Sequence, residues 1–205
     1  MARRAAPPPH SHARARRPAI GVPREVRIIG GQWKRTKLAV ADKPGLRPTP
    51  DRVRETLFNW LGHDLTGWRC VDAFAGTGAL GLEAASRGAS DVLLVEQDPD
   101  LVSRLRALQA KLGATMVKVE RANGLSVLAR LAPASADLIF LDPPFDANLH
   151  EKALAAAASA VAAEGLIYLE APTSWDDTAL AGYGLKRLRH MRAGAVHAHL
   201  LGRAA

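Results

Sequence analysis

The tetrapeptide Asp142-Pro143-Pro144-Phe145 has the residue types that could hold and activate an exocyclic amino group. Such a nitrogen is a poor nucleophile because its lone pair is delocalised into the base ring. The Asp142 carboxylate and the Pro143 carbonyl oxygen are two acceptors, so together they could hold both amino hydrogens and direct the lone pair toward an electrophile. The two prolines fix the backbone that carries these acceptors. Phe145 offers a ring on which an unpaired base can stack.

A second segment, Asp72-Ala-Phe-Ala-Gly-Thr-Gly, begins 70 residues before the tetrapeptide. Its glycines let a backbone amide approach a ligand without an intervening side chain. Gly76, Gly78 and Gly81 satisfy the pattern G-x-G-x-x-G, with Glu96 20 residues after Gly76, and by themselves would indicate NAD. However, an acid ends the strand here, and a carboxylate favours a cationic ligand over a pyrophosphate. S-adenosylmethionine (SAM), which carries a sulfonium and an ammonium group, is the better match.

Two further strand ends could complete a SAM site. The Glu96 carboxylate could accept hydrogen bonds from both ribose hydroxyls, and the Asn123 amide could meet the adenine amino group. The ordinary alternatives are a solvated acid for Glu96 and a turn residue for Asn123. The predicted cofactor contacts are Asp72, Phe74, Ala75, Gly76, Thr77, Gly78, Glu96, Gln97, Asn123 and Gly124, and no metal is expected.

Strand-like and helix-like patterns alternate after Trp68, which is typical of an α/β fold. We predict a Rossmann-like, doubly wound, mostly parallel seven-stranded sheet with right-handed crossovers, so that the strand ends above share the ligand-binding edge. Residues 185–191 and 195–201 should pair as a hairpin and add an antiparallel strand at one edge. The other predicted strands are residues 69–74, 91–95, 116–119, 136–141 and 165–170, and the predicted helices are residues 80–87, 99–112, 124–131 and 148–163.

A small extension, residues 23–62, should precede the main domain of residues 63–205. Two short strands, residues 26–31 and 36–40, are expected to join at a Gly30-Gly31 turn. Thr49 could then cap a helix whose apolar residues recur every fourth position and pack on the main domain, while Arg52 and Arg54 project elsewhere. Residues 1–22 are rich in Pro, Ala and Arg, and we expect them to be disordered because they have little to bury.

The net charge of +8 is concentrated in the N-terminal part of the chain. Residues 1–54 hold 14 Lys and Arg against three acids, which gives +11, whereas residues 55–205 hold 14 against 17, which gives −3. This asymmetry indicates a polyanionic partner, although a basic tail can also simply aid solubility. No apolar run is long enough for a membrane span, and the single Cys70 can form no intrachain disulfide, so a reducing cytoplasm is expected.

Four segments of the chain are similar to those of the bacterial 16S rRNA guanine-N2 methyltransferases. They are residues 27–35, 44–61, 72–84 and 142–145, of which residues 46–61 are the most specific because other methyltransferases lack them. The N-terminal 22 residues have no counterpart in that family pattern. His197 and His199 also depart from it, which puts an RNA contact by the last strand in doubt.

The resemblance implies a SAM-dependent enzyme that methylates the exocyclic N2 group of one guanine in 16S rRNA. The substrate would lie in a 30S subunit or an assembly intermediate, the enzyme would act as a cytoplasmic monomer, and no membrane would be involved. Asp142, Pro143 and Phe145 would be catalytic. The residues that would contact RNA are Arg35, Arg47, Thr49, Arg52, Arg54 and Pro144.

Three other functions share part of this pattern. An N6-adenine or N4-cytosine DNA methyltransferase uses the same chemistry but normally needs a larger target-recognition region than 205 residues provide. Protein glutamine methyltransferases favour Asn-Pro-Pro-Tyr over Asp-Pro-Pro-Phe. A non-enzymatic RNA-binding module would be expected to have a degraded loop or tetrapeptide, and both are intact here.

Overall fold

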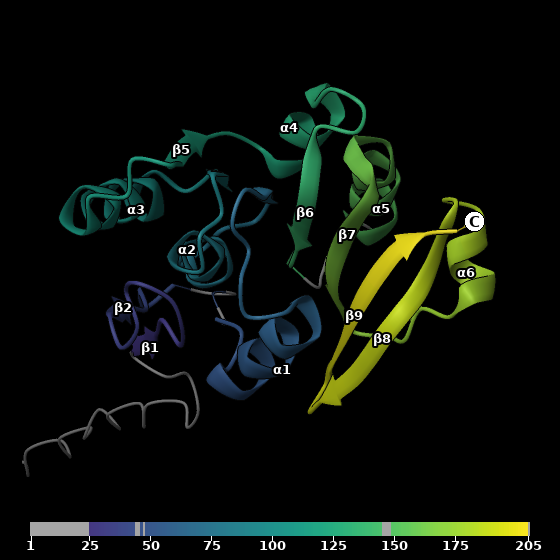
Figure 1. Cartoon of the computed structure of the whole chain (residues 1–205), viewed down its shortest axis with the longest axis horizontal. Helices are drawn as coiled ribbons and strands as arrows, with labels where there is room; N and C mark the ends of the chain where they lie inside the picture. Colours follow the sequence, from purple (N-terminus) through teal and green to yellow (C-terminus); the bar gives the residue numbers. More distant parts are fainter. Residues whose placement is uncertain (1–24, 44–45, 47, 145–148, 205) are drawn as a thin grey trace, which may run out of the picture.

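The computed structural model describes residues 25–43, 46, 48–144 and 149–204, which form a seven-stranded sheet, a separate two-stranded hairpin and six helices (Figure 1). The large sheet has the strand order β5-β4-β3-β6-β7-β9-β8. Its strands are β3 (Arg69–Asp72), β4 (Asp91–Glu96), β5 (Val117–Arg121), β6 (Ala136–Leu141), β7 (Val161–Ala171), β8 (Leu185–Ala193) and β9 (Val196–Arg203). The hairpin is β1 (Glu25–Arg27) and β2 (Lys37–Ala39), and the helices are α1 (Asp51–Leu61), α2 (Ala79–Ser86), α3 (Pro99–Leu112), α4 (Gly124–Arg130), α5 (Leu149–Ala160) and α6 (Asp177–Ala181).

The strand order reverses between β3 and β6. β3 pairs in parallel with β4 on one side and with β6 on the other. The chain builds outward from β3 through β4 to β5 and then crosses back to β6. In open α/β sheets, ligands bind at the carboxyl ends of the strands next to such a reversal. The predicted Rossmann-like fold is therefore confirmed. Of the two strands at the reversal, Asp72 ends β3 and Asp142 directly follows β6.

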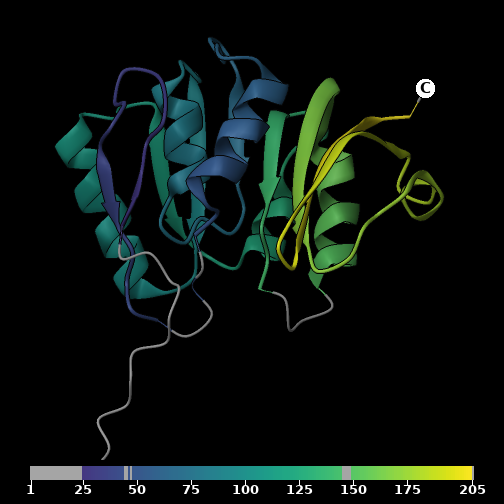
Figure 2. The same ribbon diagram turned by 90° about the horizontal axis from the view of Figure 1, so that it is seen from below.

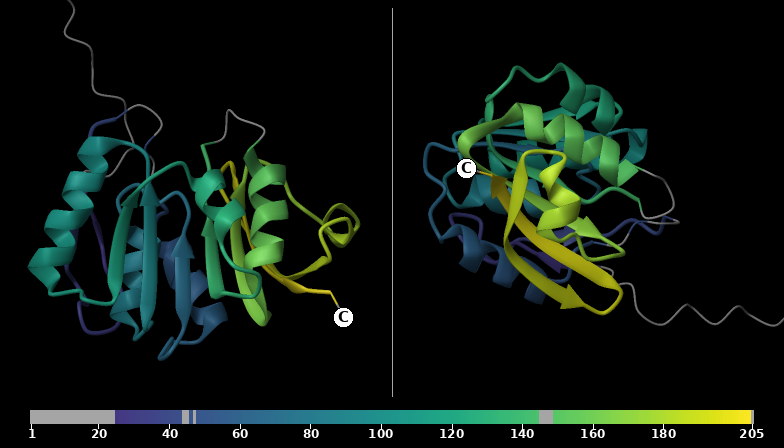
Figure 3. Two further views of the ribbon diagram at one scale, coloured as in Figure 1. Left: turned by 90° about the horizontal axis from the view of Figure 1, so that it is seen from above. Right: turned by 90° about the vertical axis from the view of Figure 1, so that its right-hand side faces the viewer.

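β8 and β9 form the predicted hairpin at one edge of the sheet (Figure 3). β9 is antiparallel to both β7 and β8, so the antiparallel strand lies one position inside the edge. β8 itself runs in the same direction as β7. As a result, the tip of this hairpin lies at the carboxyl edge of the parallel strands, the edge that binds ligands.

Helices cover both faces of the sheet, with α1 and α2 on one side and α4 and α5 on the other (Figure 1). Leu57 of α1 and Leu82 of α2 belong to one buried cluster, and Leu128 of α4 and Leu154 of α5 belong to the other. Burial on both faces explains why β6 is an almost continuous apolar run instead of an alternating one. None of the helices in the described ranges is both long and apolar enough to span a membrane.

The predicted bounds of the strands and helices after Trp68 agree with the structure to within a few residues, except for two elements. β7 begins at Val161, four residues before its predicted start. Helix α6 was not predicted because five residues are too few to show a periodic pattern. The Asp176 carboxylate caps it by accepting a hydrogen bond from the Ala179 amide at 2.9 Å.

The predicted N-terminal hairpin forms, with Val26 opposite Leu38, but its connection is longer than the predicted Gly30-Gly31 turn. The chain continues through turns to Arg35, which has a positive φ of 72°. The Arg35 amide closes this loop by donating to the Ile28 carbonyl oxygen at 2.8 Å. At Gly31, a Cβ would lie 1.8 Å from the Ser86 carbonyl oxygen, so only glycine allows the loop to pack on α2.

The prediction that Thr49 caps α1 is wrong. The N-cap position is occupied by Pro50, and no side chain caps the helix. The buried Thr49 hydroxyl instead donates to Glu170 Oε1 at 2.8 Å, which joins the N-terminal extension to the end of β7. This tertiary contact replaces the local cap that the sequence suggested.

The prediction that Arg54 projects away from the main domain is also wrong, because its side chain is fully buried. Its guanidinium donates to Thr49 O at 3.2 Å and to Asp51 Oδ1 at 2.6 Å, and lies 3.5 Å from Glu83 Oε2. Burial lowers the pKa of Arg54, although these carboxylates act in the opposite direction. Residues 54, 58 and 61 form a second buried row on α1, since this helix is covered on two sides.

The fully buried Glu83 carboxylate of α2 holds the extension in place. It accepts hydrogen bonds from the Ile29 and Gly30 amides at 2.6 and 2.7 Å and from Arg87 Nε at 2.8 Å. Together with its contact to Arg54, these bonds join the loop of the N-terminal hairpin, α1 and α2 at a single carboxylate.

Candidate active site

The glycine loop after β3 lies at the carboxyl edge of the sheet, where Glu96 fixes its position by a hydrogen bond. Gly76 and Gly78 have positive φ angles of 52° and 77°. The Gly76 amide donates to Glu96 Oε2 at 2.9 Å, and the Asp98 amide donates to Glu96 Oε1 at 2.8 Å. Gly76 and Glu96, two of the predicted cofactor contacts, are thus hydrogen-bonded to each other, with the Glu96 carboxylate at the end of β4, where we expect the ribose of a nucleoside cofactor.

Asp72 is almost fully buried, with 1% of its surface exposed. Its Oδ2 atom accepts a hydrogen bond from the Gly81 amide at 3.0 Å, whereas its Oδ1 atom has no partner within the described part of the chain. Burial raises the pKa of Asp72 to about 7. At Gly81, a Cβ would lie 2.2 Å from Leu94 Cδ2, so glycine permits this close approach. A cationic group of a bound ligand could supply the missing partner, which fits SAM.

The start of α4 packs tightly against the end of β3. A Cβ at Gly124 would lie 2.2 Å from the Ala73 carbonyl oxygen and 3.0 Å from the Phe74 ring. Asn123 is exposed at the helix start, and its Oδ1 atom caps α4 by accepting from the Ser126 amide at 3.2 Å. The cap gives Asn123 a structural role beside the predicted adenine contact.

Asp142 and Glu170 lie level with each other at the ends of neighbouring strands, because Leu141 of β6 pairs with Leu169 of β7. Burial and the negative charges of Glu170 and Asp72 raise the pKa of Asp142 well above its usual range. Glu170 is 4% exposed, and burial raises its pKa as well. Its Oε1 atom accepts from Thr49 Oγ1 and Tyr168 OH, each at 2.8 Å.

Three buried or partly buried carboxylates therefore meet at the ends of β3, β6 and β7. None of Asp72, Asp142 and Glu170 forms an ion pair with a Lys or Arg within the described ranges. This arrangement suits a positively charged ligand beside an amine. Glu170 is absent from the predicted site residues, although it too is an acid at a strand end.

The other predicted residues fall into three groups. Phe74, Ala75, Thr77 and Gln97 lie in the glycine loop or directly after β4, and Pro143 is buried while Pro144 is exposed. Arg35 and Arg52 are exposed, whereas Thr49 and Arg54 are buried and already bonded to other protein groups. The predictions for Phe145 and Arg47 lie outside the described residues.

The segment that leaves the N-terminal hairpin contacts the cofactor loop. Lys43 pairs with Asp98 at 2.6 Å and with Asp100 at 2.9 Å, both at the start of α3. A Cβ at Gly76 would lie 3.1 Å from Leu46 Cδ1. The extension thus reaches the same loop that Glu96 holds.

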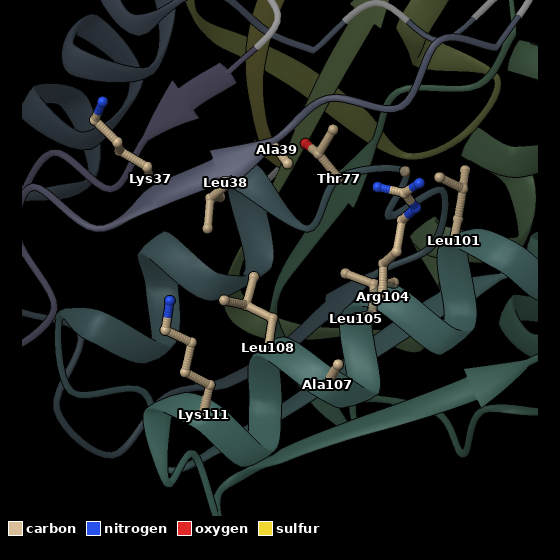
Figure 4. A pocket seen from close by; sticks show the side chains of 11 residues that line it. Lys37, Leu38, Ala39, Thr77, Leu101, Arg104, Leu105, Ala107, Leu108 and Lys111 are labelled. Atoms are coloured by element: carbon tan, nitrogen blue, oxygen red, sulfur yellow. The ribbon is translucent and has the colours of Figure 1, made fainter.

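Below this contact, a groove of about 280 Å³ runs between β2 and α3 (Figure 4). Its floor is apolar, with Leu38, Leu105 and Leu108, and Lys37, Arg104 and Lys111 line it as well. It reaches Gly76 and Thr77 but contains none of the three carboxylates.

A family model described as "Conserved hypothetical protein 95" matches residues 26–202. The chain is 46% identical over 148 residues to the ribosomal RNA small subunit methyltransferase D of Escherichia coli K12, covering 71% of this chain and 74% of the relative. It is 44% identical over 133 residues to the protein of the same name from Haemophilus influenzae, covering 63% of this chain and 69% of that relative. The chain belongs to this family.

Solved structures of the family's fold agree with this membership. A protein from Escherichia coli superposes with a TM-score of 0.76 at 40% identity, covering 88% of this chain and 99% of that one. A Haemophilus influenzae protein superposes with a TM-score of 0.71 at 31% identity and the same coverage. The family match begins at residue 26, so the N-terminal hairpin belongs to the shared structure and most of the preceding tail does not.

Proposed function

We propose that this protein is a SAM-dependent methyltransferase that methylates the exocyclic N2 group of one guanine in 16S rRNA. The observation that carries the proposal is the position of Asp142-Pro143, which follows the strand at the reversal of strand order, beside Asp72 and the glycine loop. The names of the similar proteins, ribosomal RNA small subunit methyltransferase D, support rRNA as the substrate. The choice of guanine N2 rests on the tetrapeptide and on the resemblance.

In the proposed reaction, the Asp142 carboxylate and the Pro143 carbonyl oxygen hold the two amino hydrogens of the target guanine. SAM, when bound, supplies a methyl group on a positively charged sulfur. Its ribose would lie at Glu96 and its cationic groups near Asp72, where the unpaired Oδ1 atom suits them. Because burial raises the pKa of Asp142, its carboxylate is also a stronger base and can accept the proton that the methylated amine releases.

Glu170, held by Thr49, lies beside Asp142 and acts on the site through it. The hydrogen bonds from Thr49 and Tyr168 hold the Glu170 carboxylate level with Asp142. The negative charge of Glu170 raises the pKa of Asp142, so Glu170 makes the neighbouring base stronger without contacting the substrate itself.

We further propose that residues 23–62 bind the RNA. The enzyme would act as a monomer in the cytoplasm, on rRNA within a small-subunit particle. Arg35 and Arg52 are exposed on this extension and can reach phosphates. The corrected role of Arg54 is to hold the extension on the main domain through Glu83.

Methyl transfer from labelled SAM to purified ribosomal subunits tests the proposed function. The expected result is label in small-subunit particles from a strain that lacks the family member, and in the nucleoside N2-methylguanosine after digestion. Large subunits and already methylated small subunits are the matched controls. Label in adenosine or in protein would overturn the proposal.

The Glu96→Ala variant is expected to bind SAM more weakly by about 1.5–3 kcal/mol, the value of a charge-assisted hydrogen bond. It loses both the proposed ribose contact and the bond that holds Gly76. Calorimetric titration with SAM checks this. Glu120→Ala, which changes a half-exposed residue of β5, is the control and should bind SAM like the wild type. Equal affinity of the two variants would remove Glu96 from the site.

SAM affinity is expected to rise with pH through neutrality. In the free protein, the raised pKa of Asp72, about 7, leaves part of its carboxyl protonated at neutral pH. A cationic ligand favours the ionised form, so binding should release a proton and strengthen between about pH 6 and 8. Calorimetry in two buffers with different ionisation enthalpies measures this release. Asp72→Asn should remove most of it, and a wild-type affinity that falls with rising pH would contradict the assignment.

A further inference from the structure

The C-terminal hairpin β8–β9 is the most basic part of the main domain. Residues 185–205 contain Lys186, Arg187, Arg189, Arg192 and Arg203 but no Asp or Glu. Residues 55–184 contain nine Lys and Arg against 17 acids, a difference of −8. The value of −3 for residues 55–205 is therefore the sum of a basic hairpin segment and a strongly acidic centre.

The basic hairpin points its tip toward the ligand-binding edge. His197 of β9 pairs with Ala171, one residue beyond Glu170, and Arg192 of β8 pairs with His197. Arg192 is thus three strand spacings from Asp142, about 14 Å across the sheet at nearly the same level. Figure 2 shows the two hairpins at opposite ends of the molecule, with the ends of β3 and β6 between them.

Two exposed arginines on the edge strand lack carboxylate partners. Arg189 and Arg192 form no ion pair in the described structure, and they donate only to the nearby Leu188 and Gly194 carbonyl oxygens at 2.9 and 3.1 Å. Their partners in β9, Leu200 and His197, are three residues apart, so the two arginines lie on opposite faces of the edge strand. The edge presents cations on both of its sides.

Three histidines lie side by side on one face of this hairpin. The rings of His190 and His197 are stacked with their centroids 5.2 Å apart and an interplanar angle of 12°, and His190 also stacks on His199 at 4.8 Å. His199 is buried and accepts from the Trp175 amide at 3.0 Å, and burial lowers its pKa to about 4. Within the described ranges no group of three or more such side chains is placed to hold a metal ion. The exposed His190 ring is instead a flat surface on which a base can stack.

We propose that the β8–β9 hairpin is a second RNA-binding surface, which contacts the rRNA backbone next to the target guanine. This inference rests on the proposed function. Charge complementarity favours RNA as the partner. Arginines without carboxylate partners can bind the phosphates of single-stranded RNA, and the exposed imidazole ring of His190 can stack on a base. The N-terminal extension and this hairpin then hold the RNA on either side of the acidic centre, where the cationic cofactor binds.

Salt-dependent binding of the Arg189→Ala/Arg192→Ala double variant to protein-free 16S rRNA tests the proposal. Each lost phosphate contact lowers the log–log salt slope by about 0.7–0.9, so the double variant should lose roughly 1.5. Its affinity should fall about tenfold or more, with SAM affinity unchanged. Arg106→Ala/Lys118→Ala, which removes the same charge from exposed positions on α3 and β5 at the opposite edge, is the control and should keep the wild-type slope. His190→Ala should weaken binding without changing the slope.

Three results would overturn the proposal. The first is a double variant whose slope equals that of the control. The second is a double variant that binds 30S particles weakly but binds protein-free rRNA normally, because the hairpin would then contact a ribosomal protein. The third is a double variant that dimerises on size exclusion with an unchanged slope, since basic residues also protect edge strands from pairing with each other. Binding needs no methyl transfer, so a wild type that binds but does not methylate rRNA would contradict the proposed function and leave the hairpin result standing.

Discussion

Replacement of Asp142 by alanine is expected to lower methyl transfer to the ribosomal substrate about 100- to 1000-fold, the usual effect of removing one preorganised group that acts mainly in the transition state. In the proposed reaction the Asp142 carboxylate holds an amino hydrogen and accepts the released proton, so the loss of both roles would lower turnover. SAM affinity should change little, because the proposed ribose ligand, Glu96, also holds the glycine loop and is unaffected by the change. Single-turnover transfer and SAM titration, measured on the same preparation, separate the two effects.

Asp137→Ala is the matched control for this variant. Asp137 is an acid of the same strand, β6, but lies at its amino end and pairs with Arg69 at 2.9 Å. The Asp137→Ala variant should transfer methyl groups at the wild-type rate. A near wild-type rate for Asp142→Ala would show that the tetrapeptide does not hold the amine.

Replacement of Glu83 by alanine is expected to lower the free energy of unfolding by about 3–5 kcal/mol, because it removes a fully buried carboxylate that faces the guanidinium groups of both Arg54 and Arg87. It also leaves the Ile29 and Gly30 amides without their acceptor. The midpoint of urea unfolding measures the loss, and hydrogen exchange should show early opening of the N-terminal hairpin.

Two further variants test whether the loss of stability comes from the hydrogen bonds and ion pairs of Glu83. Glu120→Ala, which removes a half-exposed acid of the surface ion pair with Arg130, should change stability by no more than about 0.5 kcal/mol. Arg54→Ala should lower the free energy of unfolding by less in the Glu83→Ala background than in the wild type, because the two side chains interact. A loss below about 1 kcal/mol for Glu83→Ala would show that the extension is held by its apolar contacts alone.

The sequence predicted the position of the site because its residues follow local patterns. Asp72 and Glu96 end strands, Asn123 and Asp142 closely follow strands, and in a doubly wound sheet the carboxyl ends of neighbouring strands lie together. The parallel order and the reversal next to β3 followed from the alternation of strands and helices. Glu170 could have been found by the same rule.

Other features depend on contacts between residues that are distant in the sequence. Arg54 belongs to a helix with one obvious apolar row, and nothing local shows that Glu83, 29 residues later, is buried against it. Thr49 precedes a helix like a cap, but its partner is Glu170, 121 residues away. The basic charge of the β8–β9 hairpin does not show in the net charge of residues 55–205, because the acids of the preceding residues outweigh it. Only the register of β7, β9 and β8 brings the tip of the hairpin to the ligand-binding edge.

The nucleoside composition of 16S rRNA from a strain that lacks this protein tests the central claim most directly. Mass spectrometry should show the loss of one N2-methylguanosine per small subunit, restored by the wild-type gene and not by one that encodes Asp142→Ala. An unchanged amount of N2-methylguanosine, or the loss of a methylated adenosine in its place, would contradict the account.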